Sequence, residues 1–258
     1  MSEKNRDGKR SARERMAAER EKQKSAEKRR RALIVGASVV CVLGLAAVIG
    51  VVAANSGKDD KSDAAAPVVT PSGATGKDGL AIPVGKDAAP STLTVWEDFR
   101  CPACQAFEAT YRPTVHELVD AGRLKVEYHL VTLIDGNMGG SGSRAAANAA
   151  ACAQDAGKFS AYHDVLYENQ PKETEDTFAD NAKLVELAGK VDGLDTPAFR
   201  ACVDKGTHDS WVTKSNAAFR SSGFNGTPTV LFNGKNIYAD QSMTPAKLKQ
   251  MVEAAAQG

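Results

Sequence analysis

The sequence predicts an α/β domain built on one sheet that a helical insertion interrupts, preceded by one N-terminal transmembrane helix. Three observations predict this. Strand-like segments lie on both sides of a block of helical segments at about 141–222. The early strand-like segments alternate with a helix-like one. A run of 23 residues without a charge, at 32–54, precedes them all.

The N-terminal arm, residues 1–31, is strongly basic, whereas the rest of the chain is acidic. The arm holds 13 Lys or Arg and 6 Asp or Glu, and the remainder holds 20 basic and 26 acidic residues. A basic arm can bind nucleic acid. This one lacks interleaved aromatic residues and ends in Arg29-Arg30-Arg31 directly before the apolar run. We therefore expect a cytoplasmic arm beside a membrane, and no nucleic-acid partner.

The apolar run at 32–54 is long enough, as a helix, to cross the ~30 Å hydrocarbon layer of a membrane. It exceeds the apolar core of a typical cleaved signal peptide, although Val52-Ala53-Ala54 leaves cleavage open as an alternative. The expected localisation is the cell membrane, with a single pass and the C-terminal bulk outside the cytoplasm. Disulfides are permitted in that compartment.

Residues 55–79 are rich in Ser, Gly, Ala, Asp and Pro and show no sustained period, which predicts a flexible linker. Residues 80–258 then form the predicted domain. They leave roughly 180 residues, enough for one sizeable core.

The domain begins with a short predicted strand at 80–84 and a β-rich one at 91–99. A helix is expected from 102 to about 121, because apolar residues recur from Phe107 at spacings of four, four and three, and Gly122 can end it. Residues 124–134 predict a further strand.

The helical insertion contains several amphipathic segments. We expect helices at 145–156, 159–168, 178–191, 197–204 and 208–220. Strand signals return at 229–232 and 236–238, joined by Asn233-Gly234-Lys235, which is typical of a hairpin turn. A last helix at 244–255 is expected to start at Ser242 or Thr244, with Pro245 in its first turn.

Cys101 and Cys104 stand where the second strand ends and the first helix begins, within the segment WEDFRCPACQAFEATY. Pro102 would occupy the first helical position. A thiolate at Cys101 would face backbone N–H groups and the positive end of the helix dipole, which lower its pKa. Cys104, one turn on, would be the resolving thiol. The alternatives are a structural disulfide, which closes a very short loop, and half of a zinc site, for which no second ligand pair has suitable spacing. We expect no metal.

Thr227-Pro228, in the segment GTPTVLFNG, precedes a predicted strand. Pro cannot continue a central ladder. Two conformations are open. A trans Pro would simply start the strand, whereas a cis Pro would turn the Thr227 backbone outward, where it could pair with an extended peptide.

With these motifs in place, residues 80–258 resemble the DsbA-like thiol–disulfide oxidoreductases of the thioredoxin superfamily. The resemblance rests on strand–FRCPAC–helix, on the helical insertion, and on GTPTVLFNG followed by a hairpin and a terminal helix. It implies a thioredoxin-like fold with a helical insertion domain. It also implies that Cys101 is the nucleophile, that Cys104 resolves, and that Thr227 and Pro228 form a substrate-binding cis-proline loop.

Two positions depart from the family. Ala103 stands where typical DsbA proteins have His, so we expect a reduction potential between those of DsbA and thioredoxin. Val95 stands where the family has a buried acid six residues before the nucleophile. Glu97 is the candidate to assist proton transfer from Cys104, and Asp98 is a weaker one that could instead face solvent or cap a turn.

Cys152 and Cys202 both fall in the helical insertion, about 50 residues apart. In an oxidising compartment a leftover pair predicts a structural disulfide, and two separate buried thiols are the alternative. The four His residues show no ligand spacing, and we expect them to be surface or core residues.

The predicted function is an extracytoplasmic oxidoreductase that introduces disulfides into secreted or membrane proteins, without a cofactor. The resemblance implies unfolded secreted proteins with free cysteines as substrates, and reoxidation by a quinone-linked membrane partner of the DsbB or vitamin K epoxide reductase type. It favours a monomer. The alternatives are a reductase or isomerase of the same fold, and a membrane-anchored peptide-binding module without catalysis.

Overall fold

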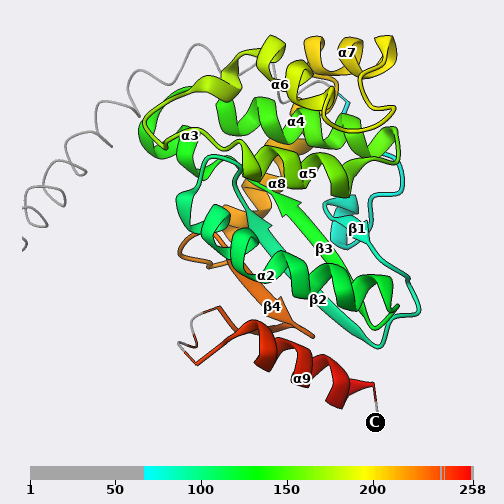
Figure 1. The fold of residues 1–258 in the computed structure, drawn as a ribbon. Helices are drawn as coiled ribbons and strands as arrows, with labels where there is room; N and C mark the ends of the chain where they lie inside the picture. The colour runs from blue at the N-terminus through cyan, green and yellow to red at the C-terminus, as the bar shows by residue number, and fades with distance from the viewer. Residues whose placement is uncertain (1–66, 239, 241, 257–258) are drawn as a thin grey trace, which may run out of the picture. The chain divides into compact units, whose positions relative to one another are not determined.

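The computed structural model describes residues 67–238, 240 and 242–256, which form one α/β unit (Figure 1). Its centre is a five-stranded sheet in the order β1-β3-β2-β4-β5. The strands are β1 (Ile82–Val84), β2 (Ser91–Glu97), β3 (Leu124–Leu130), β4 (Thr229–Phe232) and β5 (Lys235–Asn236). Only β2 and β3 run parallel among these pairs, and each of the other neighbours is antiparallel.

Strand β2 is the middle strand and carries the chain toward Cys101. Leu93 and Val95 are buried on one face of the sheet, whereas Trp96 stacks on His129 of β3 on the other. Successive side chains of a strand point to opposite faces of the sheet. Since both faces are covered, the residues that follow β2 emerge at an edge of the sheet enclosed by helices.

Eight α-helices lie in the described residues, with two short 3-10 turns, η2 (Lys77–Gly79) and η3 (Thr177–Ala179). The helices are α2 (Pro102–Asp120), α3 (Leu133–Met138), α4 (Gly142–Asp155), α5 (Phe159–Glu168), α6 (Asn181–Ala188), α7 (Pro197–Asp204), α8 (Asp209–Ser221) and α9 (Pro245–Ala255). In Figure 1, α4 to α7 gather at the end of the sheet toward which β3 points, and α2 lies across its front.

Helix α4 is the centre of the helical insertion. Its residues from Ala146 to Ala153 are all buried, and most of them are Ala. Small side chains let neighbouring helices approach closely, so α5, α7 and α8 all pack against this one helix. The insertion is thus joined to the sheet as part of one continuous core.

Several predicted boundaries are wrong, and three of them have a clear physical reason. Helix α4 begins at Gly142 instead of 145, and β2 ends at Glu97 instead of 99. The strand predicted at 124–134 ends at Leu130, because Asp98 Oδ2 accepts the Ile134 N–H at 2.8 Å and helps start α3. The helix predicted at 178–191 is split into η3 and α6, since Asp180 caps the N–H of Ala182. In the last hairpin Asn233 and Gly234 alone form the turn, both at positive φ, and Lys235 already belongs to β5.

The flexible linker predicted at 55–79 is wrong from residue 67 onward. Val69 O accepts a hydrogen bond from His208 at 2.8 Å, and the Ser72 N–H donates to Asp155 at 2.7 Å. Trp211 Nε1 donates to Gly79 O at 2.7 Å. Side chains of the helical insertion therefore satisfy the backbone of this segment, which is why it needs no apolar periodicity of its own.

The remaining N-terminal predictions lie outside the described residues. These are the basic arm at 1–31, the transmembrane helix at 32–54 and the linker as far as residue 66. Within the residues that the structure does describe, no helix combines the length and the apolar character needed to cross a membrane.

Candidate active site

Cys101 is the N-cap residue of α2, immediately after the turn that follows β2. Its N–H donates to Asp98 O at 3.0 Å, and Pro102 occupies the first helical position, as expected from the sequence. Of the cysteines that the structure describes, Cys101 and Cys104 carry free thiols. The side chain of Cys101 is buried but for 6%, and Cys104 is fully buried.

The pKa values of the two thiols are shifted in opposite directions. The pKa of Cys101 is lowered to about 6, chiefly by a hydrogen bond from Cys104 and further by Thr227 and the N–H groups of Cys104 and Ala103, against the effect of burial. The pKa of Cys104 is raised well above its usual value, chiefly by burial and then by the neighbouring Cys101. The start of α2 therefore favours the thiolate at Cys101, which attacks, and the protonated thiol at Cys104.

The peptide bond between Thr227 and Pro228 is cis, and it lies against the nucleophile. Cys101 Sγ is 3.4 Å from the carbonyl oxygen of Thr227, which is 126 residues further along the chain. Strand β4 follows this loop and pairs with β2, so the sheet itself brings the two segments together. A cavity of about 420 Å³ borders the loop and is lined by Phe224, Asn225 and Tyr238 among others.

Of the expected supporting residues, Pro102 and Ala103 are exposed beside the thiols, and Glu97 is fully buried. Glu97 also has a partner in the helical insertion. Its Oε1 is 2.8 Å from Nε2 of His163, a residue of α5 in the helical insertion. The charge of Glu97 contributes to the raised pKa of Cys104.

His163 is a site residue that sequence reasoning missed. It is 1% exposed, and its ring faces Glu97 on one side and Asp164 on the other. Burial by itself lowers its pKa, but the charge of Glu97 and the hydrogen bonds to Asp164 and Glu97 outweigh burial and raise the pKa to about 10. The available signal was Glu97 itself, because a buried carboxylate requires a partner.

Two further residues hold the backbone around Cys101. Gln170 Nε2 donates to Phe99 O at 2.8 Å and to Cys101 O at 3.0 Å. The buried guanidinium of Arg100 pairs with Asp135 at 2.7 Å and with Asp176 at 2.9 Å. The insertion therefore fixes the turn that presents the nucleophile.

The sequence suggested that Asp98 either caps a turn or faces solvent. In the structure Asp98 is buried, and it caps the turn before Cys101. Its Oδ1 accepts the N–H of Arg100 and its Oδ2 that of Ile134, each at 2.8 Å. Burial raises its pKa to about 7, against the lowering effect of these two hydrogen bonds. Its carboxylate therefore shapes the turn before Cys101.

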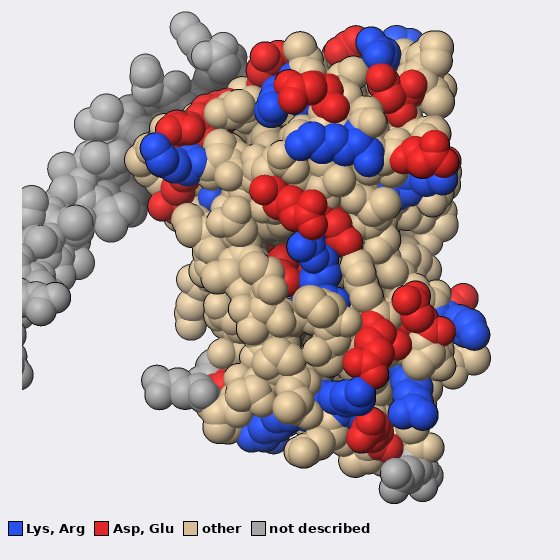
Figure 2. Space-filling view, in the orientation of Figure 1, with Lys and Arg blue, Asp and Glu red and all other residues tan. Residues whose placement is uncertain are grey.

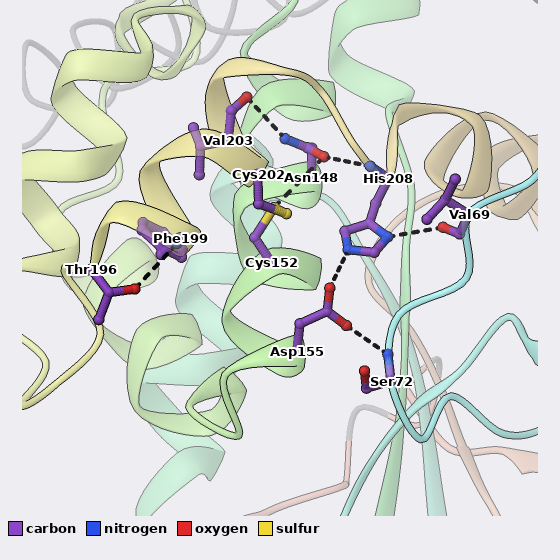
Figure 3. Close-up of a disulfide and its surroundings, with 10 residues drawn as sticks. All are labelled: Val69, Ser72, Asn148, Cys152, Asp155, Thr196, Phe199, Cys202, Val203 and His208. Carbon is purple, nitrogen blue, oxygen red and sulfur yellow. Dashed lines mark hydrogen bonds and ion pairs between the residues drawn. A yellow bond between two sulfur atoms is a disulfide. The ribbon is translucent and has the colours of Figure 1, made fainter.

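Cys152 and Cys202 are joined by a disulfide that links α4 to α7 (Figure 3). The buried Asn148 lies beside it, donating to Val203 O and accepting the N–H of His208. His208 in turn contacts Asp155 Oδ2 through Nε2 at 2.8 Å. The bond stands in the insertion, apart from the thiols at the start of α2.

The surface around these elements carries charges of both signs. Figure 2 shows acidic and basic side chains interspersed over the helical insertion and α2, in the orientation of Figure 1. The uncharged area between them includes much of the surface on this face.

Comparisons with known proteins agree with this geometry. Residues 77–254 match the family model described as thioredoxin. Disulfide bond formation protein D of Bacillus subtilis is 28% identical over 180 residues, covering 68% of this chain and 77% of that protein. Oxidised DsbA of Mycobacterium tuberculosis is 29% identical with a TM-score of 0.60, covering 69% of this chain and 93% of that one. Reduced DsbG of the same organism is 29% identical with a TM-score of 0.61, covering 72% and 90%.

Proposed function

This chain belongs to the thioredoxin family and is a DsbA-like thiol–disulfide oxidoreductase, and we propose that it introduces disulfides into secreted or membrane proteins through Cys101-Pro102-Ala103-Cys104. One observation carries the proposal. An acidic, almost buried thiol at a helix start touches the Thr227 carbonyl, while its partner thiol is fully buried. Stabilising the Cys101 thiolate favours the reduced enzyme, which makes its disulfide an oxidant.

The reaction begins with the Cys101–Cys104 disulfide. A substrate thiolate attacks Cys101 Sγ, the sulfur–sulfur bond breaks, and Cys104 leaves with the electron pair and takes up a proton. A second substrate thiolate then attacks the substrate sulfur of the mixed disulfide. The substrate leaves oxidised, and Cys101 leaves as a thiolate that its surroundings stabilise.

The support residues have distinct roles in this proposal. Pro102 starts the helix, and Ala103 supplies a backbone N–H but no charge, so the potential is intermediate. Glu97 assists proton transfer to and from Cys104 on the buried side of the site. Thr227 and Pro228 bind the backbone of an extended substrate, and the adjoining cavity of about 420 Å³ has room for its side chains.

We place the enzyme outside the cytoplasm, held at the cell membrane by residues 32–54 as a single-pass helix with residues 1–31 in the cytoplasm. Its substrates are unfolded proteins with free cysteines. A quinone-linked membrane partner of the DsbB or vitamin K epoxide reductase type reoxidises it, and it acts as a monomer without a cofactor. The charge pattern of the N-terminal segment supports the membrane placement, and the substrates, the reoxidase and the monomeric state are what the resemblance to DsbA-like proteins implies.

A second candidate is a reductase or isomerase that keeps particular thiols reduced. One observation favours it: Ala103 adds no positive charge beside Cys101. The direction of the reaction depends on the reduction potential, since the same thiols can carry either reaction.

The deciding experiment is to equilibrate the full chain in glutathione buffers and measure the reduced fraction of Cys101 and Cys104. A potential well above about −200 mV is expected and marks a disulfide donor. A value near thioredoxin's about −270 mV would overturn the oxidase proposal in favour of the reductase. A pair that does not exchange with glutathione would leave only the peptide-binding module.

A further inference from the structure

A buried ion pair links the sheet to the helical insertion next to the resolving cysteine. Glu97 on β2 is 0% exposed and His163 on α5 is 1% exposed, and 2.8 Å separates Oε1 from Nε2. The other ring nitrogen, Nδ1, is 3.4 Å from Oδ1 of Asp164. Against the lowering effect of burial, chiefly the charge of Glu97 raises the pKa of His163 to about 10, so at neutral pH both ring nitrogens can donate to these carboxylates.

The second oxygen of Glu97 has no such partner. Among the residues that the structure describes, Oε2 of Glu97 is buried without any hydrogen bond. Leaving a buried carboxylate oxygen unpaired costs free energy, so a role for it is expected. Its lone pairs are available to take up a proton.

Cys104 lies in the first turn of α2, the helix that follows the strand ending at Glu97, and it is the thiol that has a proton to exchange. Its side chain is fully buried, and the charge of Glu97 acts on it. Cys104 must lose its proton each time it attacks a mixed disulfide and regain it each time it leaves. Because solvent does not reach it, a buried group has to hold that proton in the meantime.

We propose that His163 is the positioning residue that holds Glu97 as the buried proton acceptor of Cys104. This inference rests on the proposed function and deepens it. When Cys104 attacks the mixed disulfide at Cys101, its proton moves to Oε2 of Glu97 and a bond forms between the two cysteine sulfurs. The bond to the other sulfur breaks, and that sulfur leaves with the electron pair. In the opposite direction the proton returns from Glu97 to Cys104.

Glu108 is the other carboxyl group in this cluster, and it does not compete for the role. It lies four residues after Cys104 on α2, and one of its oxygens lies within 4.8 Å of a ligand atom of both Glu97 and His163. Burial chiefly, and the charge of Glu97, raise its pKa to about 8, so it already holds a proton near neutral pH. His163 contacts Glu97 directly, at 2.8 Å, so Glu97 is the carboxyl group that the imidazole positions.

The titratable and charged groups that surround His163 come from four elements. They are Glu97 on β2, Glu108 on α2, Tyr128 on β3, and Asp164 and Tyr167 on α5. Asp98 and Cys104 act electrostatically on Tyr167 of this cluster, and Arg112 acts on Glu108. The side chain that completes the acceptor thus comes from the helical insertion, which makes the insertion part of the chemistry.

The test separates the two steps of the reaction with oxidised glutathione. Reduced full-length protein is mixed with oxidised glutathione, quenched with acid at set times, and analysed by mass spectrometry. The first step, glutathionylation of Cys101, reports its thiolate. The second step, displacement of glutathione by Cys104, reports proton transfer from Cys104.

The expected result for His163→Gln and Glu97→Gln is an unchanged first step and a second step slowed ~10-fold or more at pH 7. The second step of both variants should recover as pH rises and hydroxide replaces the lost acceptor. His129→Gln is the matched control, because it removes another buried imidazole on the opposite face of the sheet, stacked on Trp96. Its two steps should match those of the unaltered chain.

Two failures are distinguishable. If Cys101 does not form the mixed disulfide in the unaltered chain, the proposed function fails. If Cys101 reacts normally but His163→Gln keeps a second step within about twofold of the control, with the same pH profile, the role of His163 is overturned. Should His163→Gln not fold, His163→Asn takes its place, with the same expected and contradicting results. Glu97→Gln keeps the size of the side chain and reports on the acceptor itself.

Discussion

At the scale of single residues, the site makes two chemically identical side chains different. Cys101 and Cys104 are three positions apart, yet the pKa of one falls to about 6 and that of the other rises well above its usual value. The cause is position. Cys101 stands at the N-cap, where N–H groups face its sulfur, and Cys104 is one turn inside the core.

Alkylation of the reduced protein with iodoacetamide measures this difference. The rate at Cys101 should follow a titration with its midpoint near pH 6, because only the thiolate reacts. Cys104 should remain unmodified across that range. Mass spectrometry of the digested protein distinguishes the two positions, and a midpoint for Cys101 close to that of an ordinary thiol would contradict the geometry.

A matched pair of variants identifies the cause of the shift. A hydrogen bond from Cys104 is the largest contribution to the lowered pKa of Cys101. Cys104→Ala removes the donor and should move the alkylation midpoint upward. Cys104→Ser keeps a donor at the same place and should stay closer to the unaltered protein. Equal midpoints in the two variants would sink this explanation.

Residue roles were predictable where their cause is local. Cys101 follows a predicted strand and precedes Pro102, so the local sequence predicts that its thiol stands at a helix start. Thr227 and Pro228 precede a predicted strand, so the sequence indicates this position as well. The pairing of Glu97 with His163 was not predictable, because 66 residues separate them and only the packing of α5 on the sheet joins them. Single His residues carry no spacing from which a partner can be read.

At the scale of elements, Arg100 joins the catalytic turn to the helical insertion. Its side chain is 2% exposed and is held by Asp135 of α3 and by Asp176. The same two carboxylates accept the first N–H groups of α4, from Ser141 to Arg144. One guanidinium thus fixes the two acids that start the central helix.

Arg100→Met should therefore lower the free energy of unfolding by roughly 3 kcal/mol, the lower end for breaking a buried ion pair, since helix N–H groups still face the two acids. Urea denaturation of the full chain measures it. Arg200→Met is the control, because Arg200 pairs with Asp195 at the surface and should show no measurable change. Similar losses in both variants would contradict the buried role.

The disulfide joins two elements of the insertion that are distant in sequence. The sequence separation of Cys152 and Cys202 is 50 residues, so on the chain-entropy model the double variant Cys152→Ala/Cys202→Ala loses about 4 kcal/mol. Denaturant titration checks the loss. The alkylation midpoint of Cys101 serves as the control and should not move, since the bond lies outside the catalytic turn.

Elements with a clear period were predicted well, and irregular ones were not. Helix α7 has the bounds expected from its sequence, because Thr196 caps it and Pro197 begins it. Composition predicts a flexible linker over 67–79, because it cannot reveal that Asp155 and His208 hold the backbone of this segment. Helix α3 was hidden for a similar reason, as Asp98, distant in sequence, helps to start it.

At the scale of the whole molecule, stability should depend on redox state and pH together. The folded reduced protein holds the pKa of Cys101 below its value in the unfolded chain. Such a group adds stability that is present above the unfolded pKa and is lost as pH falls through about 6. The oxidised protein lacks this titration.

The melting temperature of the reduced form, relative to the oxidised form, should thus fall as pH is lowered from about 8 to about 5. Other titrating groups, such as Asp98 and Glu108, are present in both forms and largely cancel in the difference. Paired thermal scans of the full chain at the two pH values measure it. A difference that is independent of pH would contradict the thiolate stabilisation.

The overall architecture was predictable because the order of strands and helices restricts the topology. The sheet order was not, since it depends on which strand β4 joins. Strand β4 follows the insertion in the sequence and pairs with β2, with Thr94 opposite Leu231.

The pairing of β4 with β2 also affects how the protein folds during synthesis. Residues 98–228, and then β4 itself, must leave the ribosome before the central strand gains its second neighbour, so this part of the sheet forms late. Until then the nascent chain carries both thiols without the Thr227 carbonyl beside Cys101, so the substrate-binding loop is the last part of the site to form.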